Sequence, residues 1–244
     1  MKRLAVAAAF LTVVPLRVRA DGRDVGRATL CFPVVGAALG GVLAGGGALL
    51  ARALPAPIVA ALLVAASALV TGALHLDGLA DTADGFGGGR DAEHALRIMK
   101  DHAVGAYGAT ALVLGILVKA AALHPLVASG SAFTWIPIAG ALSRWAAVPL
   151  ARLPSARGSG LGAAVAEHVG DAEVAGATAI ALGVAAVLAG WRGAIVAGLA
   201  AAFVAAFGAL CRRRIGGVTG DTLGAAVELC ETLVLVLGVA LGER

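Results

Sequence analysis

Charged residues are scarce in this chain, and their scarcity decides its class. Asp, Glu, Lys and Arg make up only 14% of the 244 residues, whereas 60% are hydrophobic and the mean hydropathy is +0.93. Soluble domains carry roughly a quarter charged residues, so the composition excludes a soluble protein of this size. It predicts an all-α, polytopic integral membrane protein whose outer surface contacts the lipid bilayer.

Cysteine is also rare, and several common signatures are missing. The three cysteines lie far apart with no C-x-x-C spacing, which excludes a disulfide framework and favours packing inside apolar runs. There is no Walker loop, and no Rossmann glycine pattern follows a strand. No set of Ser, His or Cys residues suggests a nucleophile–base triad, and nothing points to a nucleic-acid partner.

Seven apolar segments are long enough, or nearly so, to cross a bilayer. They run at approximately 30–53, 57–75, 107–128, 131–151, 173–190, 193–211 and 223–241. We therefore expect about seven transmembrane helices in a single domain, residues 1–244. The apolar stretch before them, up to Val14, gives about 16 Å of helix and is too short to span. Because Pro15, Arg17 and Arg19 crowd the possible cleavage site, we expect a retained interfacial segment rather than a signal peptide.

Basic residues are distributed unevenly between the two faces that seven spans define. The face with the long loops holds twelve: Arg17, Arg19, Arg23, Arg27, Arg90, Arg97, Lys100, Arg152, Arg157, Arg212, Arg213 and Arg214. The other face holds only Arg52, Arg192 and Arg244. The positive-inside rule then places the long loops in the cytoplasm, with the chain in the cytoplasmic membrane.

Residues 75–108 form an acidic, glycine-rich insert between apolar runs. Asp77, Asp81 and Asp84 have i, i+4, i+7 spacing, which on a helix places three carboxylates within an arc of roughly 60°. Carboxylates this close repel each other, so a cation or protons must neutralise them. Hard oxygen ligands favour Mg²⁺. The alternative is structural, with Asp81 and Asp84 capping helices or turns.

The glycines and the histidine around these carboxylates extend the candidate site. Gly85 and Gly88 have no side chain, and would let a phosphate approach the backbone. His75 is a weaker candidate for binding substrate, because on a helix it lies on the opposite face from Asp77.

Residues 91–103 have the pattern of an amphipathic helix with Asp91 as its N-cap. Lys100 and Asp101 near its end are candidates for substrate binding. The alternative is that they belong to a solvated ladder of ion pairs in which charged residues follow at steps of four.

A second acidic feature stands at the start of the last apolar segment. Thr219, Gly220 and Asp221 precede Glu228, which shares a helical face with Asp221. Carboxylates in an otherwise apolar helix are functional by default, and we expect this feature to pack beside residues 77–85 and line the same cavity. Arg144 lies deep in an apolar segment and needs an anionic partner, which a substrate phosphate or a site carboxylate would supply.

Three strings of the sequence resemble one enzyme family. HLDGLADTADG, LRIMKDHAVGAYG and GGVTGDTLGAAVELCE are similar to segments of the cobalamin synthases, or adenosylcobinamide-GDP ribazoletransferases. The resemblance implies a Mg²⁺-dependent membrane enzyme that joins α-ribazole, or its 5′-phosphate, to adenosylcobinamide-GDP and releases GMP.

Carried over to this chain, the resemblance makes Asp77, Asp81 and Asp84 metal ligands, with Asp221 and Glu228 as further acidic members of the site. Asp81 or Asp221 would accept the proton of the attacking hydroxyl. A homo-oligomer is compatible with the sequence. The alternative function is a cation- or proton-coupled transporter, which would need carboxylates near the middle of the membrane.

Overall fold

The computed structural model describes residues 2–157 and 167–242, and these are almost entirely helical. In chain order the elements are α1 (Lys2–Leu11), α2 (Gly22–Ala28), the 3₁₀ turn η1 (Thr29–Cys31), α3 (Phe32–Leu50), α4 (Ala56–Val70), α5 (Leu74–Gly88), α6 (Ala92–Ile98), α7 (Ala106–Ala128), α8 (Ala132–Leu150), α10 (Asp171–Ile215) and α11 (Gly220–Leu241). Within these two ranges there is no strand, only an isolated bridge between Ser155 and Val218. The predicted all-α class is confirmed for this part of the chain.

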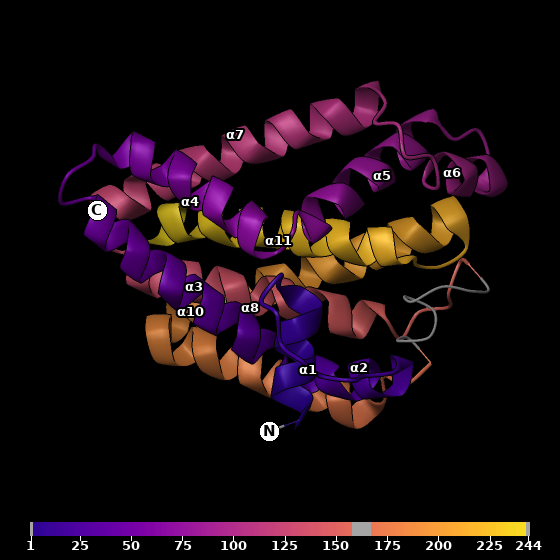
Figure 1. The fold of residues 1–244 in the computed structure, drawn as a ribbon, viewed down its shortest axis with the longest axis horizontal. Helices are drawn as coiled ribbons and strands as arrows, with labels where there is room; N and C mark the ends of the chain where they lie inside the picture. The colour runs from indigo at the N-terminus through magenta and orange to yellow at the C-terminus, as the bar shows by residue number, and fades with distance from the viewer. Residues whose placement is uncertain (1, 158–166, 243–244) are drawn as a thin grey trace.

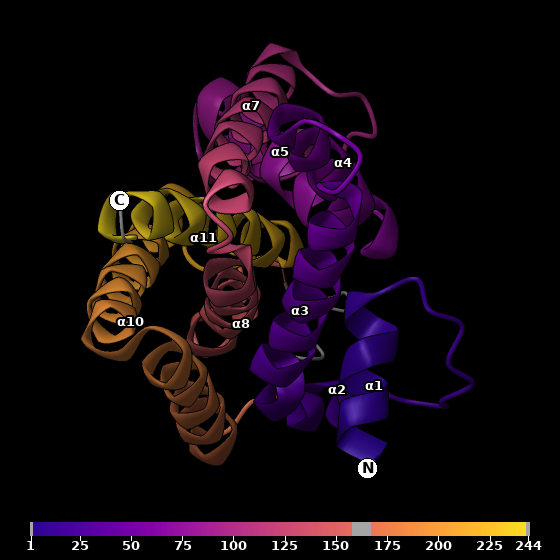
Figure 2. The ribbon, with the colours of Figure 1, turned by 90° about the vertical axis from the view of Figure 1, so that its left-hand side faces the viewer.

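Helix α8 lies at the centre of the bundle, with α3, α10 and α11 packed against it (Figures 1 and 2). Most of its residues are buried. Its contact with α3 depends on Gly36 and Gly140, because a Cβ on either residue would collide with the carbonyl group of the other. Helices α3 and α8 therefore approach each other closely through glycines at this crossing.

The predicted number of seven spans is not confirmed. In the described ranges, four segments are long and apolar enough to cross a membrane: Gly22–Leu50, Ala106–Ala128, Asp171–Ile215 and Gly220–Leu241. The count rises to five if α4 and α5, which meet at a bend of 90°, form one broken span. The predicted spans 173–190 and 193–211 both lie in α10, which is interrupted only where Gly190 leaves helical geometry (φ 55°, ψ −132°).

Large apolar side chains cover the outside of the bundle. Val42, Leu69 and Val187 are 72%, 75% and 85% exposed, and many other leucines and valines accompany them. Such a surface is unfavourable in water but suits lipid, and the helices satisfy their own backbone hydrogen bonds there. The structure is thus that of an integral membrane protein.

The polar connections gather at one end of the bundle. Figure 1 shows α2, α6 and the start of α11 at the right-hand end, whereas the C-terminus lies at the left. Helix α1 is only ten residues long and packs against α2 and α3, with Val6, Ala7 and Leu11 buried. It is too short to span, as predicted.

Candidate functional site

Helix α5 carries the first acidic cluster and begins at a sharp turn. Gly72 and Ala73 have φ values of 60° and 57°, and this left-handed turn redirects the chain by 90° from α4 into α5. Only glycine adopts such a φ without strain, which accounts for Gly72. The polar string after it is therefore a helix that bends away from α4 and packs between α7 and α11.

Three aspartates follow at successive turns of α5. Asp77 is exposed, Asp81 is half-buried and Asp84 is buried. The charges of Asp77, Asp84 and Asp221 all act unfavourably on ionised Asp81, and only that of Arg157 opposes them. The three aspartates therefore lie on one helix, as predicted, and a metal site shared by all three stays a prediction.

Asp84 has a structural partner in α7. One of its carboxylate oxygens accepts a hydrogen bond from the backbone N–H of Gly105 (2.7 Å) and the other from Gly108 (2.8 Å). These donors belong to the N-cap and first turn of α7, where a negative charge is stabilising. The structural alternative is thus realised for Asp84, and its role as a metal ligand stays a prediction.

Helix α11 begins with a reciprocal cap that fixes Asp221. The Thr219 hydroxyl accepts from the backbone N–H of Thr222 (3.2 Å), and the Thr222 hydroxyl accepts from the N–H of Thr219 (2.8 Å). The cap satisfies two N–H groups that a helix start otherwise leaves unpaired. Thr219 therefore positions the first turn of α11, on which Asp221 stands half-buried.

Arg157 is the cation beside Asp221, at 2.8 Å between the guanidinium and the carboxylate. The segment that carries it is held by backbone hydrogen bonds from Val218 to Pro154 and from Ala156 to Val218, both 2.9 Å. Gly217 permits this approach, because a Cβ there would collide with the Pro154 carbonyl group. From the sequence Arg157 is only one of the basic loop residues, so its place in the site was not predicted.

The two acidic features pack together as predicted. Helix α11 lies against α5 at a glycine contact: a Cβ on Gly78 would stand 2.5 Å from the Asp221 carbonyl oxygen and 3.1 Å from the Cα of Gly224. Since Gly78 follows Asp77 directly, this contact brings Asp77 and Asp221 to one place although 144 positions separate them in sequence.

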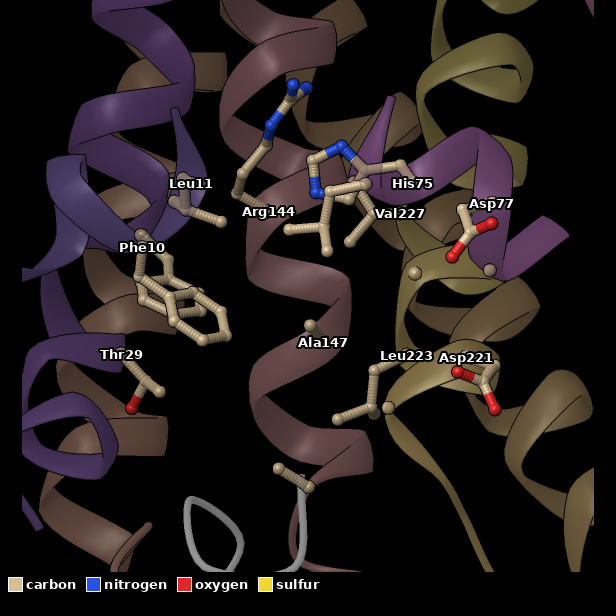
Figure 3. A pocket seen from close by; sticks show the side chains of 16 residues that line it. Phe10, Leu11, Thr29, His75, Asp77, Arg144, Ala147, Asp221, Leu223 and Val227 are labelled. Carbon is tan, nitrogen blue, oxygen red and sulfur yellow. The ribbon is translucent and has the colours of Figure 1, made fainter. Parts of the chain in front are cut away.

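A cavity of about 200 Å³ lies between α1, α3, α5, α8 and α11. Asp77 and Asp221 lie on one side of it, and Arg144 and His75 also line it (Figure 3). On the opposite side stand Phe10, Leu11 and Thr29. Phe32 and Gly220 line the cavity as well. His75 thus lines the cavity together with Asp77, although the two side chains leave α5 in different directions.

Four charged side chains form a buried network next to the cavity. Lys119 of α7 pairs with Glu228 and, at 3.3 Å, with Glu231, while Arg144 of α8 pairs with Glu231. The four side chains are 4–11% exposed. Arg144 therefore has the anionic partner that a buried arginine needs, and this partner is Glu231.

Glu228 lies in this network rather than beside Asp221. Seven residues of α11, about 10 Å of helix, separate the two carboxylates, and Glu228 does not line the cavity that holds Asp221. Its partner is the Lys119 ammonium group, so a metal-ligand role for Glu228 stays a prediction without support from this geometry. Lys119 was missed, although a lysine inside an apolar run is a functional signal by default.

The remaining predicted binding residues lie elsewhere. Gly85 and Gly88 belong to the last turn of α5, where they pack near Met99 and Ile98. Lys100 and Asp101 are exposed in the connection after α6. None of these four residues lines the cavity, and their substrate-binding roles stay predictions.

The predicted helix over 91–103 is shorter than expected. Asp91 is its N-cap, accepting from the His94 N–H at 2.8 Å, but α6 ends at Ile98. The chain must turn there to bring Gly105 and Gly108 back to Asp84, so the long-range contact overrides the local helical pattern.

The chemistry of the side chains fits Mg²⁺ only in part. Among the described residues, no three Asp, Glu, His or Cys side chains stand close enough to share one ion. Asp77 and Asp221 nevertheless face one cavity, and Mg²⁺ is commonly bound by one or two carboxylates together with waters and substrate phosphates. The donor set therefore suits an ion that arrives with a phosphate substrate.

Comparisons with known proteins agree with the resemblance seen in the sequence. The sequence profile of the family described as cobalamin-5-phosphate synthase matches residues 3–239. The adenosylcobinamide-GDP ribazoletransferase of Geotalea daltonii is 40% identical, and the match covers 98% of this chain and 97% of that protein. Proteins of the same name from Rhizobium etli and Pseudomonas syringae are 43% and 41% identical, with 94% and 95% of this chain covered and 93% and 96% of theirs. No solved structure matches the chain significantly.

The match runs through both acidic features and the helices that bring them together, and the relatives have nearly the same length. The predicted resemblance is confirmed: this chain belongs to the cobalamin-5-phosphate synthase family.

Proposed function

We propose that this protein is an adenosylcobinamide-GDP ribazoletransferase, which joins α-ribazole or its 5′-phosphate to adenosylcobinamide-GDP and releases GMP. The observation that supports this most directly is the cavity that Asp77 of α5 and Asp221 of α11 face together. The family match and the names of the relatives support the same reaction.

The proposed reaction is the displacement of GMP at phosphorus. A ribose hydroxyl of α-ribazole attacks the phosphorus that bears cobinamide, a new P–O bond forms, and the bond to GMP breaks. The hydroxyl proton passes to a carboxylate, and the leaving phosphate takes the electron pair. Asp221 and Asp81 are the two candidates for the proton acceptor. Asp221 lines the cavity but is paired with Arg157, whereas Asp81 makes no ion pair within the described ranges and lies one turn beyond Asp77, outside the cavity lining.

Arg157 would take part in binding the phosphates. Two nitrogens of its guanidinium group, Nε and one terminal nitrogen, are buried without a hydrogen-bond partner in the described structure. Arginine binds phosphate oxygens through such paired donors. Arg157 does not itself line the cavity but contacts Asp221, which does. A diphosphate that reaches past Asp221 would satisfy these nitrogens and would reduce the cost of leaving them unpaired.

Mg²⁺ is the proposed cofactor, held by Asp77 and Asp221, with Asp81 one turn further along α5. When bound, the ion would neutralise charge on the phosphoryl oxygens during the displacement. The protein's own side chains would orient the two substrates and keep the cavity closed to competing water.

We propose that the site faces the cytoplasm. The basic connections, including the one that carries Arg157, gather at the same end of the bundle as the acidic residues, and the positive-inside rule assigns that end to the cytoplasmic side. Nucleotide substrates are then available without crossing the membrane.

The carboxylates of Glu228 and Glu231 give little support to the alternative that the protein is a transporter. Glu228 and Glu231 do lie further into the bundle than Asp221, as a transporter would require. Each is nevertheless paired with Lys119 or Arg144, so the network is balanced and offers no vacant charge to a moving ion.

The test is GMP release by the purified protein given both substrates and Mg²⁺. Asp77→Asn and Asp221→Asn keep the side-chain shape and remove the charge, and each should lower turnover on the order of 10²-fold, the scale of losing one electrostatic contact in the transition state. Asp171→Asn is the matched control, because Asp171 is exposed and pairs only with Arg152 at the surface. An inactive wild-type protein, or full turnover in both site variants, would refute the proposal.

A further inference from the structure

The cavity has two chemically different sides. Asp77 and Asp221 face it from α5 and α11, whereas Phe10 and Leu11 approach from α1 on the other side (Figure 3). The ring of Phe10 is stacked on that of Phe32, with 5.7 Å between the ring centroids and 17° between the planes. The apolar side therefore presents an aromatic surface opposite the charged one.

This aromatic side offers no free hydrogen-bond donor among its described side chains. Phe10, Leu11 and Phe32 have no polar group, and the Thr29 hydroxyl donates its hydrogen to the backbone carbonyl of Gly26 at 2.6 Å, so that only its oxygen can still accept. A ligand with hydrogen-bond acceptors along its edges would lose hydrogen bonds to water here without replacement, which opposes its binding. A flat ligand with carbon edges would lose none.

The proposed function, on which this step rests, brings three ring systems to the enzyme. Guanine has donors and acceptors around its rim, and its binding against the aromatic side of the cavity is therefore disfavoured. A corrin ring carries amide side chains around its rim, and their hydrogen bonds to water would be lost against this side of the cavity. The base of α-ribazole is a benzimidazole with two methyl groups, which is flat and has an apolar edge.

We propose that Phe10, supported by Phe32, binds the benzimidazole base of α-ribazole by stacking and thereby selects the acceptor nucleoside. The base then lies against α1, and the ribose extends across the cavity toward Asp77 and Asp221. Helix α1 is thus part of the acceptor site as well as a short helix at the edge of the bundle.

The experiment measures GMP release by the purified full-length protein while each substrate is varied in turn. Phe10→Leu keeps an apolar side chain but removes the aromatic face, and Phe10 is only half-buried, so the fold is preserved. Stacking on a base is worth about 1–3 kcal/mol, so the KM for α-ribazole should rise about tenfold. The KM for adenosylcobinamide-GDP should stay within about twofold. Phe203→Leu, in the stacked pair of Phe203 and Phe207 in α10, is the matched control and should change neither KM.

A nucleoside with an imidazole base supplies a second readout, because it lacks the fused benzene ring that would stack. The wild-type protein should prefer the benzimidazole nucleoside, and Phe10→Leu should lose most of this preference. A structural defect would lower turnover for both nucleosides alike. A rise in the KM for adenosylcobinamide-GDP alone, or equal rises for both substrates, would overturn the inference.

Calorimetric binding of α-ribazole separates this inference from the proposed function. A wild-type protein that binds α-ribazole more tightly than Phe10→Leu does, yet releases no GMP, would refute the function and support the binding site. Equal binding by the two proteins, or no binding by either, would refute the binding site even if GMP is released.

Discussion

Replacing Lys119 by methionine tests the buried charge network, because it removes one cation and keeps most of the side-chain volume. Lys119 and Glu228 are 5% and 6% exposed and pair directly. In the variant the Glu228 carboxylate stays buried without its partner, while Glu231 retains Arg144. Breaking a buried pair in this way costs about 3–5 kcal/mol.

The double variant Lys119→Met/Glu228→Leu separates loss of charge balance from loss of packing. It removes one charge of each sign and leaves the pair of Arg144 and Glu231. Because apolar residues of similar volume often replace a buried ion pair without loss, we expect the double variant to recover most of the stability. This outcome would show that the network is needed for neutrality rather than for its attraction energy.

The assay is thermal unfolding of the detergent-solubilised protein, followed with a dye that becomes fluorescent on reacting with thiols. All three cysteines are free, and Cys211 and Cys230 are buried, so they react only on unfolding. For a chain of this size each kcal/mol corresponds to about 2–4 °C, so Lys119→Met should lower Tm by roughly 6–20 °C. Lys100→Met, at an exposed lysine, should leave Tm unchanged. An unchanged Tm in Lys119→Met, or a double variant no more stable than the single one, would contradict the reasoning.

Two further predictions concern the joint site and its orientation. Gly78→Ala places a Cβ 2.5 Å from the Asp221 carbonyl oxygen and should lower GMP release at least tenfold by separating α5 from α11. The control is Gly41→Ala, whose added Cβ would have nothing within 4 Å and should have no effect. Normal turnover in Gly78→Ala would contradict the contact between α5 and α11. A cysteine at position 88 should react with an impermeant thiol reagent only from the cytoplasmic side and one at position 129 only from outside, and labelling of position 88 in intact cells would overturn the orientation.

The apolar runs and the spacing of the aspartates predicted the features that depend only on residues close together in the sequence. The apolar runs at 107–128 and 223–241 became α7 and α11, because helices of that length bury apolar side chains and satisfy their own backbone. The spacing of Asp77 and Asp81 correctly placed both on one helix. The predicted span 57–75 failed at its end, since α4 stops at Val70 and the left-handed turn at Gly72 follows. Glycine inside an apolar run does not show by itself whether it packs or turns.

The remaining features of the site depend on contacts between residues far apart in the chain, and the sequence does not show which residues will meet. Asp84 caps α7 only because residues 21 and 24 positions further on return to it. The contact between Lys119 and Glu231 joins residues 112 positions apart. The presence of a lysine in an apolar run was readable and was overlooked, but its choice of partner required the packing of α7 against α11.

Carboxylates of α11 take part in two groups of charged residues, and the two groups differ in net charge. This difference distinguishes a structural role from a binding role. In the network, the charges of Glu228 and Glu231 are matched by Lys119 and Arg144. About two turns away, Asp81 is acted on by the negative charges of Asp77, Asp84 and Asp221 and by the positive charge of Arg157. Arg157 is also the ion-pair partner of Asp221, and residues 158–166 contain no charged residue. Asp77, Asp81 and Asp221 against one guanidinium leave negative charge that the protein itself does not neutralise. At the edge of an apolar bundle that charge is costly unless a cation binds. The excess is therefore the physical reason to expect a divalent ion in the cavity, and the balanced network is the reason to expect none beside Glu228.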